Sequence, residues 1–200
     1  EDPNIAQKVT QMQAELEADP QYADRFQPIG EAAIELSTEG QFVGESVFGN
    51  LVMDIFRSAV QSHMAVSTAS SFREGIPPCA ILGEDLYIAM PYTNRILVFD
   101  MTGTQLQELI NYSVSRSGTN FFSQVSGVRF NIVDGRPANI QLLTAPSNPN
   151  AGYSPLSPAA TYKVATTDFQ GLIADGYKDI FAKATYVNTG IKIREKVRLF

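Results

Sequence analysis

Few side chains in this sequence can perform catalysis. Its 200 residues include one histidine, His63, and one cysteine, Cys79. A histidine-assisted serine or cysteine nucleophile would have to use His63, and a metal centre built from several imidazoles or thiolates is excluded. Cys79 has no partner for an intrachain disulfide. A complete enzyme in this chain would therefore have to centre on His63 or on Asp175.

Simpler structural roles explain both of these rare residues. His63 follows a predicted helix and precedes an apolar segment, which favours a capping or packing role. Cys79 comes directly before an apolar run at 80–82 and is expected to be a small buried residue. Neither residue is predicted to be catalytic.

Arg73 is a candidate for binding an anion. It follows a run of small and hydroxylated residues at 67–71. Backbone amides and hydroxyls in such a loop, together with one guanidinium, can line a cavity for a small anion. The alternative is a surface arginine paired with Glu74.

Two loop aromatics and one acidic residue are further candidates. Tyr92 and Phe169 each occupy a turn-like segment directly after a predicted strand. Rings in such positions stack on flat ligands, or they pack the loop against the core. Asp175 precedes a predicted helix, where a capping role is sufficient to explain it. The residues alone leave these alternatives open.

The composition is that of a folded acidic domain. Hydrophobic residues make up 44% and charged residues 18%, and the formal net charge is −6. An acidic chain without a basic run is a poor ligand for a phosphate backbone, so no nucleic acid polymer is expected as a partner. No apolar run approaches the roughly 20 residues of a membrane span, and no signal peptide is recognised. The start at Glu1 is expected to be a mature or trimmed end.

The patterning of the chain predicts a mixture of helices and strands, that is, an α+β (mixed α/β) fold. Pro- and Gly-containing segments at 67–79 and 144–160 are expected to be loops, and Asp134-Gly135 is a strong hairpin signal. The last predicted helix is cut short by the chain end, which suggests a fragment. The expected helices are 4–19, 46–61, 104–116, 176–184 and 189–200, and the expected strands are 33–36, 64–66, 85–90, 95–101, 122–133, 138–142 and 162–166.

Several stretches, taken in order, carry a resemblance that covers nearly the whole chain. They are 45–54 (ESVFGNLVMD), 72–73 (FR), 90–94 (MPYTN), 99–103 (FDMTG), 122–127 (FSQVSG), 164–169 (VATTDF) and 175–177 (DGY). This pattern resembles the C-terminal domain of the 5′-nucleotidase and 2′,3′-cyclic phosphodiesterase family. Residues 1–29 are similar to the helix and connection that join the two domains in that family, and residues 30–200 to the C-terminal domain itself.

The resemblance implies a role for five residues in binding substrate. Tyr92 and Phe169 would sandwich a nucleobase, and Asp175 would bind the ribose hydroxyls. Arg73 would supply the cation at the end of the family's glycine-rich loop, and Thr68 stands at the position of that loop's asparagine.

The same resemblance implies that the chain is the substrate-binding and specificity domain of a metal-dependent phosphoesterase. It would present the phosphate of a nucleotide or nucleoside substrate to two divalent metal ions on an absent N-terminal metallophosphoesterase domain. No catalytic residue and no metal or other cofactor is then expected in this chain, which alone would be inactive. The resemblance also implies a periplasmic or extracellular location.

Some positions depart from the family pattern. Ala69, Ser70 and Ser71 replace three loop glycines, and Gly44 stands where a second arginine is expected. Tyr92 replaces a phenylalanine, and residues 173–174 replace a Gly-Gly pair. These departures leave an alternative function, which is a divergent domain of the same fold that has lost nucleotide binding and serves as an interaction or structural module.

Overall fold

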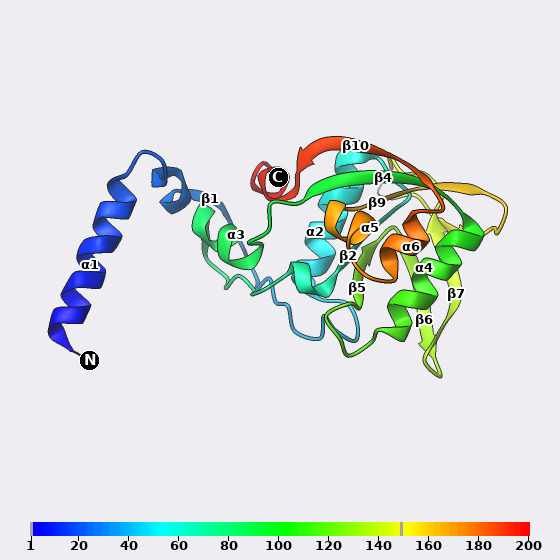
Figure 1. The fold of residues 1–200 in the computed structure, drawn as a ribbon, viewed down its shortest axis with the longest axis horizontal. Coiled ribbons are helices and arrows are strands. Elements are labelled where there is room, and N and C mark those ends of the chain that lie inside the picture. Colours follow the sequence, from blue (N-terminus) through cyan, green and yellow to red (C-terminus); the bar gives the residue numbers. More distant parts are fainter. Residues whose placement is uncertain (1, 149) are drawn as a thin grey trace.

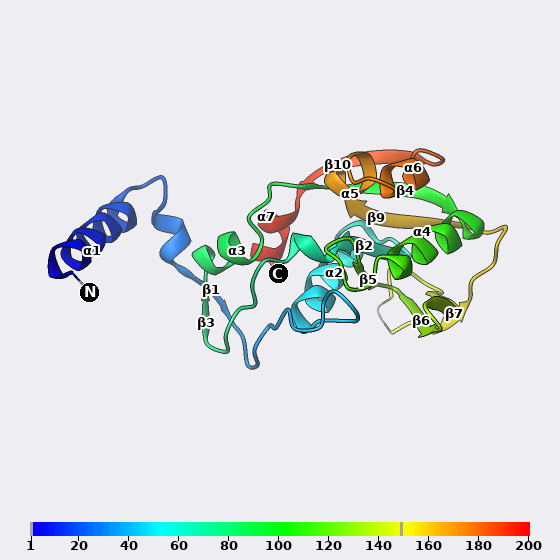
Figure 2. The same cartoon turned by 60° about the horizontal axis from the view of Figure 1, so that its bottom comes forward.

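A computed structural model describes residues 2–148 and 150–200 of the chain. Helix α1 (Pro3–Ala18) projects from the rest of the molecule (Figures 1 and 2). A short 3-10 helix (Ala23–Phe26) follows it and lies against the body, where Asp24 pairs with Arg198 and the Arg25 guanidinium covers the ring of Tyr87. Asp2 caps α1 by accepting a hydrogen bond from the backbone N of Asn4 (2.9 Å). No residue of α1 is buried, so its apolar side chains Ile5, Val9, Met12 and Leu16 are exposed.

A mixed five-stranded sheet forms the centre of the body, with the strand order β10-β4-β9-β2-β5. Strands β2 and β9 run parallel, and the other neighbouring pairs run antiparallel. The bounds are β2 (Met64–Thr68), β4 (Arg95–Thr102), β5 (Ser123–Ser126), β9 (Thr161–Thr167) and β10 (Thr185–Lys192).

Two smaller sheets flank the central one. One contains β6 (Val128–Val133), β7 (Arg136–Leu143) and β8 (Tyr153–Pro155), and the other pairs β1 (Pro28–Glu31) with β3 (Ala80–Leu82). The turn between β6 and β7 is Asp134-Gly135, and both residues have positive φ (49° and 71°). This conformation suits a two-residue hairpin, and the prediction from the Asp-Gly pair is confirmed.

Helices cover both faces of the central sheet (Figure 2). The two long ones begin at side-chain caps: Ser46 accepts from the backbone N of Gly49 (3.1 Å), and Thr102 forms a capping box with Gln105. The bounds are α2 (Val47–Val60), α3 (Gly83–Ala89), α4 (Gly103–Ser115), α5 (Asp168–Leu172), α6 (Tyr177–Phe181) and α7 (Ile193–Arg198).

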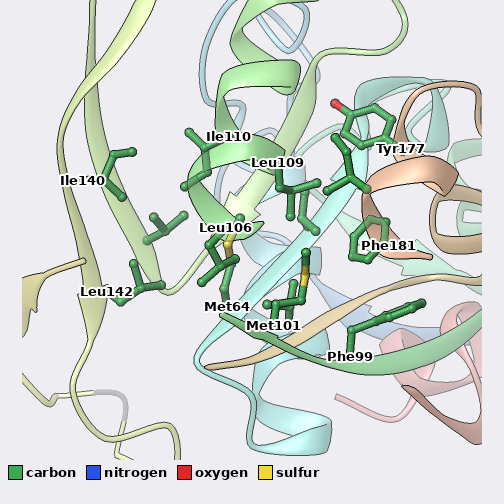
Figure 3. Close-up of a cluster of buried hydrophobic side chains, with 14 of the residues drawn as sticks. Met64, Phe99, Met101, Leu106, Leu109, Ile110, Ile140, Leu142, Tyr177 and Phe181 are labelled. Atoms are coloured by element: carbon green, nitrogen blue, oxygen red, sulfur yellow. The ribbon is translucent and has the colours of Figure 1, made fainter. Parts of the chain in front are cut away.

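Each face of the sheet has its own hydrophobic core. Alternate residues of β2 point to opposite sides, so that Met64 and Val66 join one cluster while Ala65 joins the other. The first cluster lies between the sheet, α4, α6 and the β6–β7 hairpin (Figure 3), and the second lies under α2, α3 and α7. Burial of each large side chain contributes about 1.5–3 kcal/mol and fixes the strand ends that carry the site.

The predicted α+β fold class is confirmed, whereas several predicted elements are wrong. Residues 85–90 were expected to be a strand, but α3 occupies most of them because Asp85 accepts from the backbone N of Leu82 (2.7 Å) and starts a helix. Residues 33–36 form only a single bridge, from Leu36 to Ile76, and the strand lies earlier, at β1.

The C-terminal segment also differs from its prediction. Residues 189–200 were expected to be one helix, but they complete β10 and then form the short helix α7. The expected loop at 67–79 begins inside β2, and the one at 144–160 contains β8. Cys79, expected to be buried, is exposed.

Candidate ligand-binding site

Three chain segments meet at one end of the central sheet. The parallel strands β2 and β9 end at Thr68 and Thr167. Strand β4 runs the opposite way and begins there, with Ile96 opposite Thr167. The segments that follow β2 and β9 and the segment that precedes β4 therefore lie together, as ligand-binding loops do at the carboxyl ends of parallel strands.

These three segments form one small cleft. Ser70 and Ser71 from the segment after β2, Tyr92 and Asn94 from the segment before β4, and Phe169 from the start of α5 line a space of about 120 Å³. Tyr92 is 48% exposed, and Phe169 is half-buried against the first core. The structure thus brings together the two aromatic residues that the sequence singled out.

Phe169 is held on a rigid support. It lies in the first turn of α5 rather than in a loop, because the hydroxyl of Thr167 caps the helix by accepting from the backbone N of Gln170 (2.9 Å). The buried Gln170 side chain donates to the hydroxyl of Ser123 (3.0 Å). Ser123 in turn contacts the hydroxyl of Tyr177 (2.8 Å), whose pKa is raised by burial.

Four hydroxyl groups form a cluster at the cleft, and two of them belong to the lining residues Ser70 and Ser71. The hydroxyl oxygens of Ser67 and Ser71 lie 2.8 Å apart, and the hydroxyl of Thr68 lies 3.1 Å from that of Ser70 and 3.4 Å from that of Ser71. Thr68 is fully buried and does not line the cleft. Its contacts make it a support for the two serines.

Arg73 lies near this loop with an exposed side chain. Its backbone N donates to the carbonyl of Ala89 (2.8 Å), which ties the segment after β2 to the end of α3, just before Tyr92. Within residues 2–148 and 150–200, its guanidinium makes no ion pair, so the expected surface pair with Glu74 is absent there.

Asp175 lies outside the cleft. Its side chain is 87% exposed and pairs with Lys178 (2.7 Å), and the hydrogen bond from Lys178 lowers the pKa of the carboxyl group. The N-cap of α6 is Gly176, without a side-chain cap, so the capping explanation for Asp175 is wrong.

A buried glutamine that the sequence analysis did not single out fixes the segment before α2. The side-chain oxygen of Gln124 accepts from the backbone N of Ser46 (3.0 Å), and its amide nitrogen donates to the carbonyls of Gln41 (2.8 Å) and Gly44 (2.7 Å). The only signal in the sequence was a long polar residue within a largely buried segment. Gly44 is a position that departs from the family pattern, and its backbone carbonyl is fixed by this hydrogen bond from Gln124.

His63 joins two strands. Its backbone N donates to the carbonyl of Lys163 (2.9 Å), and its Nδ1 accepts from the backbone N of Lys163 (3.0 Å). Burial, followed by the charge of Lys163, lowers the pKa of the imidazole. The helix before it, α2, ends at Val60 with Gln61 as its C-cap, so strand pairing, rather than helix capping, describes the position of His63.

The described part of the chain has neither of two further features, a metal-ligand cluster and a membrane-spanning helix. No group of three or more His, Cys, Asp or Glu side chains there is placed to hold a metal ion. No helix among the described residues is long and apolar enough to cross a membrane.

The fold and the cleft define an α+β domain with an open aromatic cleft at one end of its central sheet. The family model described as "5′-nucleotidase, C-terminal domain" matches residues 28–183. The chain therefore belongs to this family, and the predicted resemblance is confirmed.

Individual proteins agree with this assignment. The chain is 28% identical to the trifunctional nucleotide phosphoesterase YfkN of Bacillus subtilis over 93% of its own length and 13% of that protein. It is 25% identical to UshA of Escherichia coli over 88% of its length and 32% of that protein. The crystal structure of a 5′-nucleotidase precursor from Thermus thermophilus superposes with a TM-score of 0.81 and 26% identity, covering 97% of this chain and 39% of that one. The chain thus spans about a third or less of the two curated relatives.

Proposed function

We propose that this chain is the substrate-binding and specificity domain of a two-domain phosphoesterase of the 5′-nucleotidase type. The observation that carries the proposal is the shared cleft of Tyr92 and Phe169. A nucleobase stacked on an aromatic ring gains about 1–3 kcal/mol, and two rings from separate, well-anchored segments can contact both faces of one base.

Two charged residues that do not line the cleft would supply contacts for the rest of a nucleotide. The exposed guanidinium of Arg73 has no ion-pair partner among the described residues and can donate paired hydrogen bonds to a phosphate. Asp175 has a carboxylate that can accept from ribose hydroxyls once it releases Lys178. Thr68 acts through the hydroxyls of Ser70 and Ser71.

Hydrolysis would take place on a preceding domain. The matched relatives are much longer than this chain, which supports a partner domain in the same polypeptide. Two divalent metal ions on that domain would supply the activated water. This chain would hold base and ribose and present the phosphate, and the parent protein would act in the periplasm or outside the cell, as the family resemblance implies.

Calorimetric titration of the purified chain with nucleoside monophosphates tests the proposal. Tyr92→Ala and Phe169→Ala should each weaken binding about tenfold, since each removes one stacked face. Tyr186→Ala is the matched control, because Tyr186 is also 48% exposed but lies on β10, outside the cleft. Absence of heat with every nucleotide would instead favour the alternative, a non-binding interaction module.

A further inference from the structure

We propose that the cleft selects a single six-membered ring, so that the domain prefers pyrimidine over purine nucleotides. This inference rests on the proposed function and adds the class of base. It depends on three features of the described residues, which are the size of the cleft, its closed floor and the hydroxyl groups in its wall.

The space between the two aromatic residues is small. The cleft measures about 120 Å³, whereas a cavity of roughly 150 Å³ in another protein holds one benzene ring. A pyrimidine is of benzene size, and a purine adds a second fused ring. One ring therefore fills the space that Ser70, Ser71, Tyr92, Asn94 and Phe169 line, and a second fused ring would project from the open side of the cleft, where it gains no contact with them.

The floor of the cleft does not allow deeper entry. A second cavity shares Ser71, Tyr92 and Asn94 with the cleft and is closed by Phe56, Phe72 and other buried residues. It measures about 10 Å³, and a water molecule needs roughly 10–15 Å³. A larger base would have to displace core side chains, which costs stability because the interior is closely packed.

Ser70 and Ser71 form the wall on the β2 side. Their side chains are held in place: Ser71 by the hydroxyls of Ser67 (2.8 Å) and Thr68 (3.4 Å), and Ser70 by that of Thr68 (3.1 Å). Rotating either serine away from a bulky ligand would break a contact to a buried hydroxyl. The wall is therefore expected to resist widening.

The hydroxyl cluster also provides a hydrogen-bond donor. Four hydroxyls carry four protons, and the described contacts among them are three, so at least one proton has no acceptor within the cluster. Either atom of each contact can be the donor, so the cluster can place this proton on Ser70 or Ser71, the two of its members that reach the cleft. The 2-keto oxygen common to uracil and cytosine is a suitable acceptor.

The test is calorimetric titration of the chain with UMP, CMP, AMP and GMP. We expect the dissociation constants of the two pyrimidine nucleotides to be lower than those of the two purine nucleotides by about tenfold or more. Loss of one stacking contact would produce a difference of this size. A Ser70→Gly/Ser71→Gly variant should reduce this ratio by raising affinity for AMP and GMP. Ser117→Gly, in an exposed turn outside the cleft, is the control and should leave the ratio unchanged.

A second variant keeps the wall while altering its donor. Ser70→Ala should weaken UMP and CMP binding about three- to tenfold, as loss of one hydrogen bond does, with little change for AMP. This arm remains informative if the double glycine variant fails to fold. Equal or tighter binding of purines by the unmodified chain overturns the inference and leaves the proposed function standing. Failure of all four nucleotides to bind overturns both.

Discussion

The side-chain oxygen of Gln124 lies so close to Gly49 that a Cβ at that position would clash with it. Gly49 belongs to the first turn of α2, and Gln124 lies on the edge strand β5. Because no side chain separates them, Gln124 reaches the backbone of the segment that precedes α2. This contact fixes one helix start against one strand and positions the segment around Gly44.

Substitution Gly49→Ala should therefore destabilise the domain. The new methyl group would displace the Gln124 side chain, and such overpacking costs about 1–3 kcal/mol. The Tm should fall by about 2–4 °C for each kcal/mol in a domain of this size. Gly30→Ala is the control, because a Cβ there meets no atom within 4 Å. Equal melting of the two variants would contradict the steric argument.

Removal of the Gln124 side chain should have a related effect by another route. Gln124→Ala leaves the carbonyls of Gln41 and Gly44 and the backbone N of Ser46 without their partner. Loss of a buried partner costs about 1–3 kcal/mol for each group left unsatisfied. Urea unfolding measures the change, with Gln13→Ala on the exposed helix α1 as control. Unchanged stability would show that water replaces these bonds.

Arg73 should distinguish nucleotides from nucleosides. If its guanidinium binds phosphate, Arg73→Ala weakens binding of a nucleoside monophosphate about tenfold and leaves binding of the nucleoside unchanged, because a hydrogen bond to a charged group contributes about 1.5–3 kcal/mol. Arg136→Ala, at an exposed position in the β6–β7 hairpin, controls for the loss of one positive charge. A parallel loss for both ligands would assign Arg73 to support of the cleft rather than to phosphate binding.

His63 should make stability depend on pH in one direction. Its lowered pKa means that the unfolded chain binds the proton more readily than the folded chain, and protonation at Nδ1 removes the bond from Lys163. The stabilising contribution is therefore complete above the ordinary pKa near 6.5 and decreases as the pH falls below it. As His63 is the only histidine, the difference in urea unfolding between the native chain and His63→Gln isolates this effect. Stability that does not change relative to His63→Gln between pH 7.5 and pH 5 would contradict it.

Local signals in the sequence identified the elements whose formation depends on neighbouring residues. The starts of the helices expected at 46–61 and 104–116 and the Asp134-Gly135 turn depend on residues a few positions away, so the sequence alone indicated them. The helix expected at 189–200 overlaps the second half of β10, and that strand was missed because its pairing with β4 depends on residues far away in the chain. The seven residues of α3 are too few for periodicity to separate a helix from a strand.

Some residues of the candidate site could be predicted from the sequence, but their arrangement in space could not. Tyr92 and Phe169 were identified from their loops and the resemblance, but their meeting at one end of the sheet depends on the parallel pairing of β2 with β9. The sequence could not show that Thr68 is buried or that Asp175 is paired with Lys178. Nor could it show that Ser70 and Ser71 line the cleft, since that follows from tertiary structure alone.

The purified chain should not hydrolyse phosphate esters, with or without added divalent metal ions. Within residues 2–148 and 150–200 no cluster of ligating side chains is placed to hold a metal ion, and the Nδ1 of His63 accepts a backbone hydrogen bond. Release of inorganic phosphate from UMP and AMP in the presence of Mn²⁺, Mg²⁺ or Zn²⁺ measures this. Any trace activity is compared with that of His63→Gln after repeated purification. Turnover that remains with the protein through purification and is lost in His63→Gln would locate catalysis in this chain. It would therefore contradict the proposal that a preceding domain carries out hydrolysis.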